Sequence, residues 1–390
     1  MRHSLKTVLV AASSLALVAT MAAAPAQARA KDPEVVASGL VGPLSLTVGQ
    51  GQDLYVTQNF MGALSKITKR GGVETVASVN NPETQSLGGV AYHQGSTYHL
   101  EADFGGEMPV SHVVRIDKFG RRTVVSDNLW EHEMSVNPDA GNRYGFVGLQ
   151  GSCAAELTAF EAAFPAELQG MPFLQEYTGI VESNAYQLTV AKDGTIYVAD
   201  AAANAILKVN RQGDISTVAV LPASQVTFSA QLEDGYEEQL ENFVVETGIV
   251  MDTDIPDCVV GQQFTHEPVP TDVQIGHQGH LYVPTLQGAA GEVLPLSKVY
   301  QVNPRTGSTT VLAGGMHGAT GLAIAPNGQI FVAELFGGKV SAIQDGHVRT
   351  VFEAHSPSDV AVHGAWLYAT TGVFAGSGGA VVKHHYPTGR

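Results

Sequence analysis

The sequence predicts an all-β fold, a six-bladed β-propeller whose N-terminal strand completes the last blade. Three observations lead to this fold class. The 390 residues include 43 glycines and 18 prolines but only 15% charged residues, which provides many turns and enough apolar material for a large core. A hairpin pattern recurs six times along the chain. Finally, the sequence pattern of the last strand in each repeat also occurs once before the first repeat.

Residues 1–30 have the layout of a secretory signal peptide. Two basic residues precede an apolar run over 8–24, and small-residue cleavage triplets follow it. A membrane anchor is the alternative, but the run is short for a span and ends in small residues. We therefore expect a secreted, extracellular protein, exported by a Sec-type signal peptide and without a membrane anchor, in which residues 31–390 form a single propeller domain.

Each repeat begins with a short alternating stretch, and a polar or glycine turn joins this stretch to an aromatic strand. The six aromatic strands lie at residues 53–58, 97–103, 195–201, 280–286, 329–335 and 366–372. A third strand follows, such as AILKVN at 205–210, and a second turn leads to a fourth strand, such as ISTVAVL at 215–221. Turn residues between period-two runs predict hairpins, and a sixfold repeat of four strands indicates a propeller.

The sixth repeat lacks a fourth strand, because the sequence ends at Arg390 soon after AVVKHHY at 380–386. EVVASGL at 34–40 has the pattern of the missing strand. A blade without its fourth strand would expose an unpaired sheet edge. We expect the N-terminal strand to pair with the last blade and close the ring.

Two part-helical insertions interrupt the repeats, at residues 128–183 and 223–269. Both lead into first strands, so we expect them to rise over one face of the propeller as a lid. The first contains AAELTAFEAAFPAELQG, which is apolar at helical spacing and predicts a short helix ended by Pro165. The second contains LEDGYEEQLENF at 232–243, which is acidic and expected to be partly helical.

The only two cysteines, Cys153 and Cys258, lie one in each insertion. An even number of cysteines in an exported protein favours a disulfide. Such a bond would join the two insertions across the third blade. Two unpaired thiols, or a two-cysteine metal site with histidine, are the alternatives.

The repeat register brings acidic residues to one axial funnel. The third residue after the aromatic of each second strand is polar in all six repeats, and the first strands add two more acids. Five carboxylates result, one from each of blades two to six: Glu101, Asp200, Asp272, Glu334 and Asp359. Carboxylates that converge without cations raise one another's pKa unless a cation binds among them, and Ca²⁺ suits such oxygen ligands. Alternatively, these acids cap turns or bond to the backbone of neighbouring blades.

Three histidines, His266, His317 and His355, fall in the loops that lead into the first strands of blades four to six. Together with the nearby carboxylates they could hold a transition metal or act as acid–base groups. His317, His355 and Glu334 are therefore the candidate catalytic residues. Ordinary polar surface histidines are the alternative.

Three phrases, at 34–59, 184–222 and 267–288, resemble the ScyD/ScyE family: EVVASGLVGPLSLTVGQGQDLYVTQN, NAYQLTVAKDGTIYVADAAANAILKVNRQGDISTVAVLP and EPVPTDVQIGHQGHLYVPTLQG. These exported bacterial proteins are named from the scytonemin gene cluster and are related to NHL repeats. The resemblance implies an exported propeller but supplies no reaction and no catalytic residues. The fold also resembles, more distantly, the senescence-marker-type lactonases, strictosidine synthase-like enzymes and streptogramin lyases, whose motifs do not map onto this sequence.

The formal net charge of −16 and the lack of any basic run argue against nucleic acid and anionic membrane surfaces as partners. No G-x-S-x-G, H-E-x-x-H or phosphate-binding lysine motif is present, which argues against nucleophilic and nucleotide chemistry. We expect a monomer that binds a small molecule or an extracellular protein in the acidic funnel under the lid. The alternatives are a hydrolase or lactonase that depends on a divalent cation such as calcium, and a lyase or isomerase with a histidine or glutamate of the funnel as base.

Overall fold

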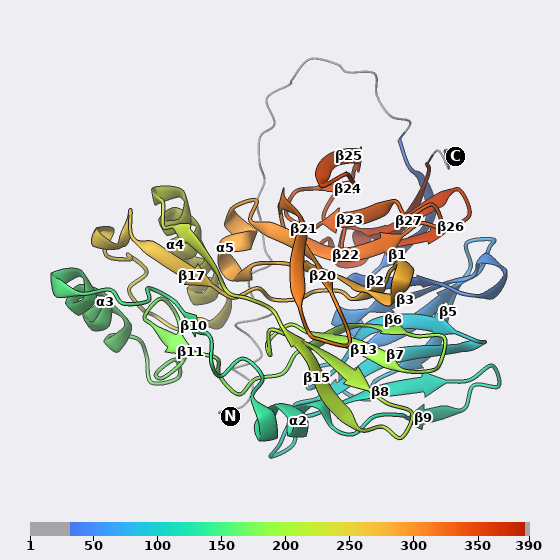
Figure 1. Ribbon diagram of the computed structural model, residues 1–390, viewed down its shortest axis with the longest axis horizontal. Coiled ribbons are helices and arrows are strands. Elements are labelled where there is room, and N and C mark those ends of the chain that lie inside the picture. Colours follow the sequence, from blue (N-terminus) through green and yellow to red (C-terminus); the bar gives the residue numbers. More distant parts are fainter. Residues whose placement is uncertain (1–31, 387–390) are drawn as a thin grey trace.

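The computed structural model describes residues 32–386, so the predicted signal peptide lies outside the described residues. Within the described part of the chain, the strands form six four-stranded antiparallel sheets and two two-stranded ones. The innermost strands of neighbouring four-stranded sheets pack side by side, and the sixth sheet packs on the first. This closed ring of sheets is the predicted β-propeller (Figure 1).

The four strands of each blade are given in order from the innermost strand to the outermost. Blades 1 to 3 consist of β2 (Pro43–Val48), β3 (Leu54–Gln58), β4 (Ala63–Ile67) and β5 (Val73–Ser78); of β6 (Gln85–His93), β7 (Ser96–Asp103), β8 (Val110–Ile116) and β9 (Arg122–Val124); and of β12 (Ala185–Val190), β13 (Ile196–Asp200), β14 (Ala205–Val209) and β15 (Ile215–Val220). Blades 4 to 6 consist of β18 (Gln274–Ile275), β19 (Leu281–Thr285), β20 (Ser297–Val302) and β21 (Thr309–Met316); of β22 (Ala319–Ile324), β23 (Ile330–Glu334), β24 (Lys339–Gln344) and β25 (His347–Glu353); and of β26 (Val360–His363), β27 (Trp366–Thr371), β28 (Gly379–His385) and β1 (Glu34–Leu40).

The N-terminal strand closes the ring as predicted. β1 pairs antiparallel with β28, with Glu34 opposite Lys383 and Leu40 opposite Gly379. Blade 6 is therefore built from both ends of the described chain. This pairing covers the β28 edge that would otherwise be open.

The turn between β12 and β13 shows why these segments form hairpins. Asp193 Oδ1 accepts a hydrogen bond from the backbone N–H of Thr195 at 3.0 Å, and Gly194 adopts a φ of +87°, which glycine reaches without strain. The apolar residues on either side alternate, so that Leu188 and Val198 face each other inside the blade stack.

The propeller core lies between adjacent blades rather than along the axis. Ala199 and Ile206 of blade 3, for example, pack against Leu281 and Val283 of blade 4, and all four are buried. Similar clusters fill the spaces between the other neighbouring sheets. Burial of these apolar faces is the main source of stability in such a fold.

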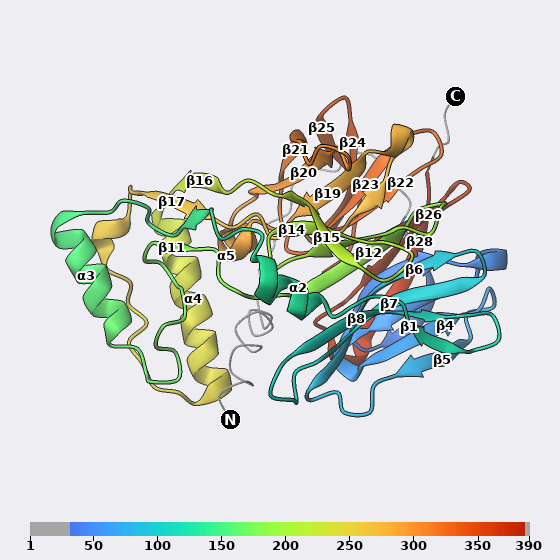
Figure 2. The same ribbon diagram turned by 60° about the horizontal axis from the view of Figure 1, so that its bottom comes forward.

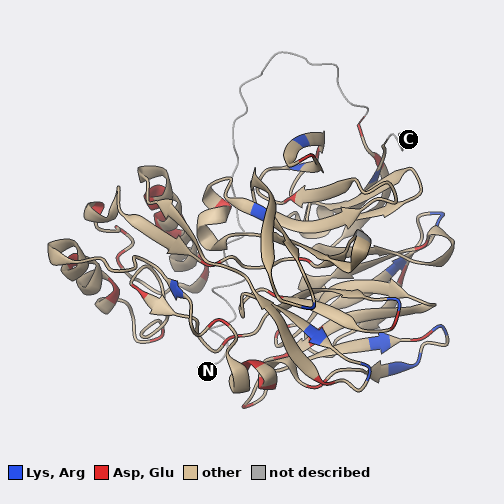
Figure 3. Ribbon diagram, viewed as in Figure 1, with Lys and Arg blue, Asp and Glu red and all other residues tan. Residues whose placement is uncertain are grey.

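The two insertions pack against each other and form a lobe beside the propeller (Figures 1 and 2). This insertion lobe contains β10 (Arg143–Tyr144), α3 (Gly151–Ala162) and β11 (Tyr177–Thr178) from the first insertion, and β16 (Ser224–Thr227), α4 (Ala230–Thr247) and β17 (Gln263–His266) from the second. Acidic residues are spread over α3 and α4 (Figure 3). The first insertion also provides α2 (Leu129–Val136), which packs on β8 and β15 of the propeller.

Helix α4 follows from local sequence signals. Ser229 caps its start by accepting a hydrogen bond from the N–H of Leu232, and Gly248 ends it with a φ of +70°. Leu232, Tyr236, Leu240 and Phe243 form its buried face. The helix is longer than the predicted segment 232–243. A further short helix, α5 (Gly288–Val293), was not predicted; it follows β19 and packs on α4.

The predicted disulfide is present. Cys153 of α3 bonds to Cys258, with 5.6 Å between their Cα atoms, and joins the two insertions within the lobe. Such a bond fits an oxidising compartment. Among the helices of residues 32–386, none is both long and apolar enough to cross a membrane.

Candidate functional site

Six residues take equivalent positions in the repeats, on the innermost strand of each blade or just before it. From blade 1 to blade 6 they are Ser45, Gly89, Gln187, Asp272, Gly321 and Asp359. Asp272 Oδ2 accepts the backbone N–H of Leu322 at 2.7 Å, and Asp359 Oδ2 accepts that of Leu46 at 2.7 Å. Each bond reaches from one blade to the innermost strand of the next. These two predicted site acids therefore act as ties between blades.

Gln187 crosses the propeller axis from blade 3. Its Nε2 donates to Ser45 Oγ of blade 1 at 2.6 Å and to Asp359 Oδ2 of blade 6 at 3.1 Å. Glycines make room for this contact, since a Cβ at Gly89 would lie 2.5 Å from the Cα of Gln187. A Cβ at Gly321 would likewise lie 2.5 Å from the Cα of Asp359. Side chains from blades 1, 3 and 6 therefore meet through hydrogen bonds where the sequence predicts a funnel.

Asp272 and Asp359 are two buried acids with raised pKa values. Burial raises the pKa of Asp272 to about 7. Burial, followed by the charge of Asp272, raises the pKa of Asp359 well above its ordinary 3.8, although the backbone N–H of Leu46 opposes this shift. The charge of Asp272 therefore acts on Asp359 in the direction expected for neighbouring carboxylates.

Asp200 holds the segment that leads into β12. It is fully buried at the end of β13, where Ser183 Oγ donates to Oδ2 at 2.6 Å. The backbone N–H groups of Asn184 and Ala203 donate to Oδ1 at 2.7 and 3.3 Å. Burial raises its pKa. Its contacts are those of a turn cap, the structural alternative named for these acids.

Glu334 and Glu101 pair with cations that the repeat register did not reveal. Glu334 is fully buried, with Lys339 Nζ 3.5 Å from Oε2 and a hydrogen bond from Ser341 to Oε1. Glu101 forms an ion pair with Arg122 from the outer strand of its own blade. Burial raises the pKa of Glu101, but hydrogen bonds from His99 and Arg122 outweigh it and bring the pKa to about 2. The expectation that all five acids converge without cations is therefore wrong for these two.

The three predicted histidines lie in different surroundings. The ring Nε2 of His317 donates to the backbone oxygen of Glu292 at 2.7 Å, and its backbone N–H donates to Glu334 Oε2 at 2.9 Å. His355 is exposed. His266 is buried in β17, and burial lowers its pKa to about 4. Only His317 and Glu334, of the candidate catalytic residues, contact each other.

Residues 32–386 contain no group of three or more His, Cys, Asp or Glu side chains placed to share a metal ion. Each of the five predicted carboxylates already accepts a hydrogen bond from another group of the protein. Metal binding by this set stays a prediction.

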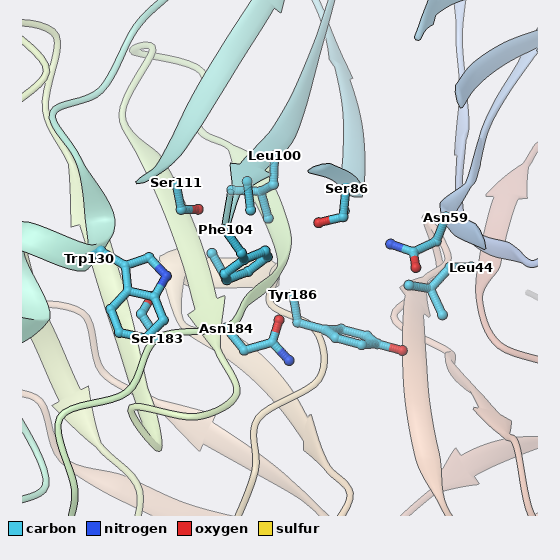
Figure 4. Close-up of a pocket in the computed structure, with 13 residues that line it drawn as sticks. Leu44, Asn59, Ser86, Leu100, Phe104, Ser111, Trp130, Ser183, Asn184 and Tyr186 are labelled. Carbon is cyan, nitrogen blue, oxygen red and sulfur yellow. The ribbon is translucent and has the colours of Figure 1, made fainter. Parts of the chain in front are cut away.

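A cavity of about 90 Å³ lies among blades 1, 2 and 3, on the face formed by the loops between second and third strands (Figure 4). We call it the front pocket. All its lining residues are uncharged: Leu44, Asn59, Ser86, Gly88, Leu100, Ala102, Phe104, Ser111, Trp130, Ser183, Asn184, Ala185 and Tyr186. Only the two ends of the first insertion border it, so the lobe itself is no lid over this pocket.

Helix α2 fixes Trp130 at the edge of the front pocket. Asn128 Oδ1 caps the helix by accepting the N–H of Trp130 at 3.1 Å, and it also accepts the N–H of Ser111 from β8 at 2.9 Å. The Trp130 ring packs edge-on against Phe104, with centroids 6.5 Å apart. Its Nε1 is buried and has no hydrogen-bond partner among the described residues. Figure 4 shows this nitrogen on the side of the ring toward Phe104.

Sequence reasoning missed the front pocket because Trp130 belongs to an insertion and has no counterpart in the repeats. The register therefore gives it no position. The one available signal is Asn128 ahead of Leu129–Trp130, a helix-start pattern that would have placed a tryptophan in the first turn of a helix.

Comparison with known proteins supports the propeller fold only. No protein-family model matches the chain, and no curated protein does. Among solved structures, the PQQ-bound aldose sugar dehydrogenase of Streptomyces coelicolor is 12% identical with a TM-score of 0.50, over 93% of this chain and 99% of its own.

Two further solved structures have the same degree of likeness. A putative oxidoreductase (glucose dehydrogenase) of Thermus thermophilus is 16% identical with a TM-score of 0.50, over 90% of this chain and 99% of its own. A gluconolactonase of Xanthomonas campestris is 12% identical with a TM-score of 0.50, over 90% and 88%. At these identities the likeness shows a shared fold.

Proposed function

We propose that this chain is an exported, ScyD/ScyE-like propeller that binds a small uncharged molecule in the front pocket. The observation that carries the proposal is Trp130 Nε1, a buried N–H donor without a partner among residues 32–386, at the edge of an uncharged cavity. A buried donor left unpaired costs about 1–3 kcal/mol. A ligand that offers a hydrogen-bond acceptor at this point would remove that cost.

The remaining lining supports the same class of ligand. Phe104, Trp130 and Tyr186 provide aromatic surface, and Ser86 and Asn184 add polar groups without charge. The volume of about 90 Å³ is well below the range of roughly 300–1,000 Å³ typical of drug-sized ligands. The pocket therefore suits a small molecule, or one end of a larger one.

The metal-dependent lactonase remains the second candidate, with support from the fold alone. The gluconolactonase likeness lies at 12% identity, and the predicted carboxylates are already engaged within the protein. Binding in the front pocket needs neither a metal nor a base. This is why we place binding first.

The test uses the two tryptophans of the chain, Trp130 and Trp366. The purified protein is screened against a library of small uncharged compounds, with intrinsic fluorescence and melting temperature as readouts. Compounds that bind the front pocket should change the emission of the parent and of the Trp366→Phe variant, but not that of Trp130→Phe. If no compound changes the Trp130 emission, or if Trp130→Phe responds equally, the proposal is wrong. Turnover of gluconolactone that requires added Ca²⁺ would favour the lactonase instead.

A further inference from the structure

Helix α2 connects the front pocket to a group of buried acids. Trp130 borders the pocket, and Glu133 lies one helical turn further along the same helix. Glu133 is buried and only 2% exposed. Its Oε1 has no hydrogen-bond partner in the described part of the chain. The helix thus has a ligand-facing residue and a poorly satisfied carboxyl within a single turn.

The charged groups that act most strongly on Glu133 are all acids. They are Asp200 at the end of β13, Asp139 in the loop after α2, and Glu182 ahead of β12. A hydrogen bond from the backbone N–H of Glu182 to Glu133 opposes their effect in part. On α2 itself, Glu131 is exposed and His132 Nε2 lies 3.0 Å from Thr217 Oγ1.

Asp139, and a further acid that it acts on, accept hydrogen bonds from neutral donors. Asp139 Oδ2 accepts from Tyr144 OH at 2.8 Å and from Asn204 Nδ2 at 2.9 Å. Glu267, whose pKa is raised first by burial and then by the charges of Asp139 and Glu182, accepts from Tyr177 OH at 3.0 Å. A charged Glu133 would therefore face further acids across a buried contact with one oxygen unpaired. A protonated Glu133 avoids both the burial of a charge and the repulsion by these acids.

We propose that Glu133 positions Trp130 at the front pocket only while its carboxyl holds a proton, and that loss of this proton releases α2 and opens the pocket. The inference rests on the proposed function for its link to ligand binding. The movement of α2 itself needs no ligand.

The direction of the pH effect follows from the two states of the helix. Burial, followed by the charge of Asp200, raises the pKa of docked Glu133 from 4.5 to about 8. In the released helix, Glu133 has its ordinary pKa and gives up its proton at lower pH. Between these two values, the ratio of released to docked helix rises by up to about tenfold for each pH unit. Docking is thus favoured in acid and weakened as the pH rises toward 8.

The experiment reads Trp130 directly. In the full-length chain with Trp366→Phe, Trp130 is the single tryptophan. We expect its emission to shift to longer wavelength as the pH rises from about 6 to about 9, because the released ring meets water. Glu133→Gln, which mimics the protonated acid, should keep the short-wavelength emission throughout. Glu131→Gln changes an exposed acid of the same helix and should behave like the parent.

Three results overturn the proposal: a parent emission that does not move with pH, a Glu133→Gln variant that shifts as the parent does, or a Glu131→Gln variant that loses the shift. Glu133→Met serves the same purpose should Glu133→Gln fail to fold. His132 is separable, because burial lowers its pKa below 6.5. Since this titration contains no ligand, its failure is distinct from a failure of the compound screen, which would overturn the proposed function alone.

Discussion

The side-chain amide of Gln187 lies 3.1 Å from Oδ2 of Asp359, and this contact spans the ring from blade 3 to blade 6. Most contacts between blades join neighbours, so a bond between opposite blades has a different role. It fixes the distance across the centre of the propeller. The first prediction tests this contact, and the second tests the packing around Asp359.

Replacing Gln187 with Leu should lower the free energy of unfolding by about 1–3 kcal/mol. The change removes the donor to Ser45 and Asp359 and the acceptor of the Leu188 N–H. Urea denaturation at neutral pH measures the loss. Gln344→Leu, at an exposed end of β24, is the matched control and should have little effect. Equal losses in both variants would contradict the role of Gln187.

Gly321→Ala should destabilise the propeller by about 1–3 kcal/mol or more, because the new Cβ meets backbone as well as a side chain. It would lie 2.5 Å from the Cα of Asp359 and 2.7 Å from the backbone oxygen of Ser358. Gly141→Ala is the control, since nothing lies within 4 Å of a Cβ there. The measurement is thermal melting of both variants beside the parent. A Gly321→Ala variant that melts with the parent would show that the axis can widen.

Stability should fall as the pH rises from about 4 to about 7. The pKa of Asp272 is about 7 in the folded chain against an ordinary 3.8, so the folded state holds a proton that the unfolded state has lost. Urea denaturation at several pH values gives the slope, and Asp272→Asn should reduce it. Asp193→Asn, at an exposed turn where the backbone N–H of Thr195 lowers the pKa of Asp193, should leave the slope in place. An unchanged slope in Asp272→Asn would refute this assignment.

Removing the disulfide should destabilise the insertion lobe. Cys153 and Cys258 are 105 residues apart, and a loop of this length corresponds to about 4–5 kcal/mol in the chain-entropy treatment. The paired Cys153→Ser, Cys258→Ser variant should melt earlier than the parent, and reductant should lower only the parent's melting temperature. A thiol assay on unfolded, unreduced protein should find no free thiol. Two reactive thiols would show that the bond does not form.

Val269→Gly should stabilise the chain by about 1 kcal/mol. Val269 has a φ of +51°, which costs a β-branched residue on the order of 1–3 kcal/mol, and its N–H donates to Asn204 Oδ1 at 2.9 Å. Glycine removes the strain and keeps that bond. Val260→Gly, at an ordinary φ of −63°, should instead destabilise. The prediction fails if both variants lose stability equally in urea titrations.

Features with a period or a repeat could be predicted from the sequence. The six blades follow from alternation and turn residues, and the pairing of Glu34 with Lys383 follows from one missing strand. Cys153–Cys258 follows from there being only two cysteines. Helix α5, the ribbons of the lobe and the packing of α3 on the second insertion carry no repeat, so their positions depend on tertiary contacts that no local pattern encodes.

The candidate site shows the limit of register. Register places Asp272 and Asp359 correctly at the innermost strands, but it does not tell whether their partner is a ligand or the N–H of the next blade. It also says nothing of Arg122, which reaches Glu101 from another strand. Trp130 lies outside the register altogether. The front pocket therefore depends on how an insertion docks, which is a matter of packing rather than pattern.

The pairing of β1 with β28 has a consequence for chain order. These two strands form the two arms of an antiparallel hairpin that lacks only its turn, since Glu34 lies opposite Lys383. A circularly permuted gene could supply that turn and open the chain at an exposed hairpin elsewhere, such as the one between β24 and β25. Every strand would keep its partners. The present order of the blades along the chain is thus one of several that would give the same closed ring.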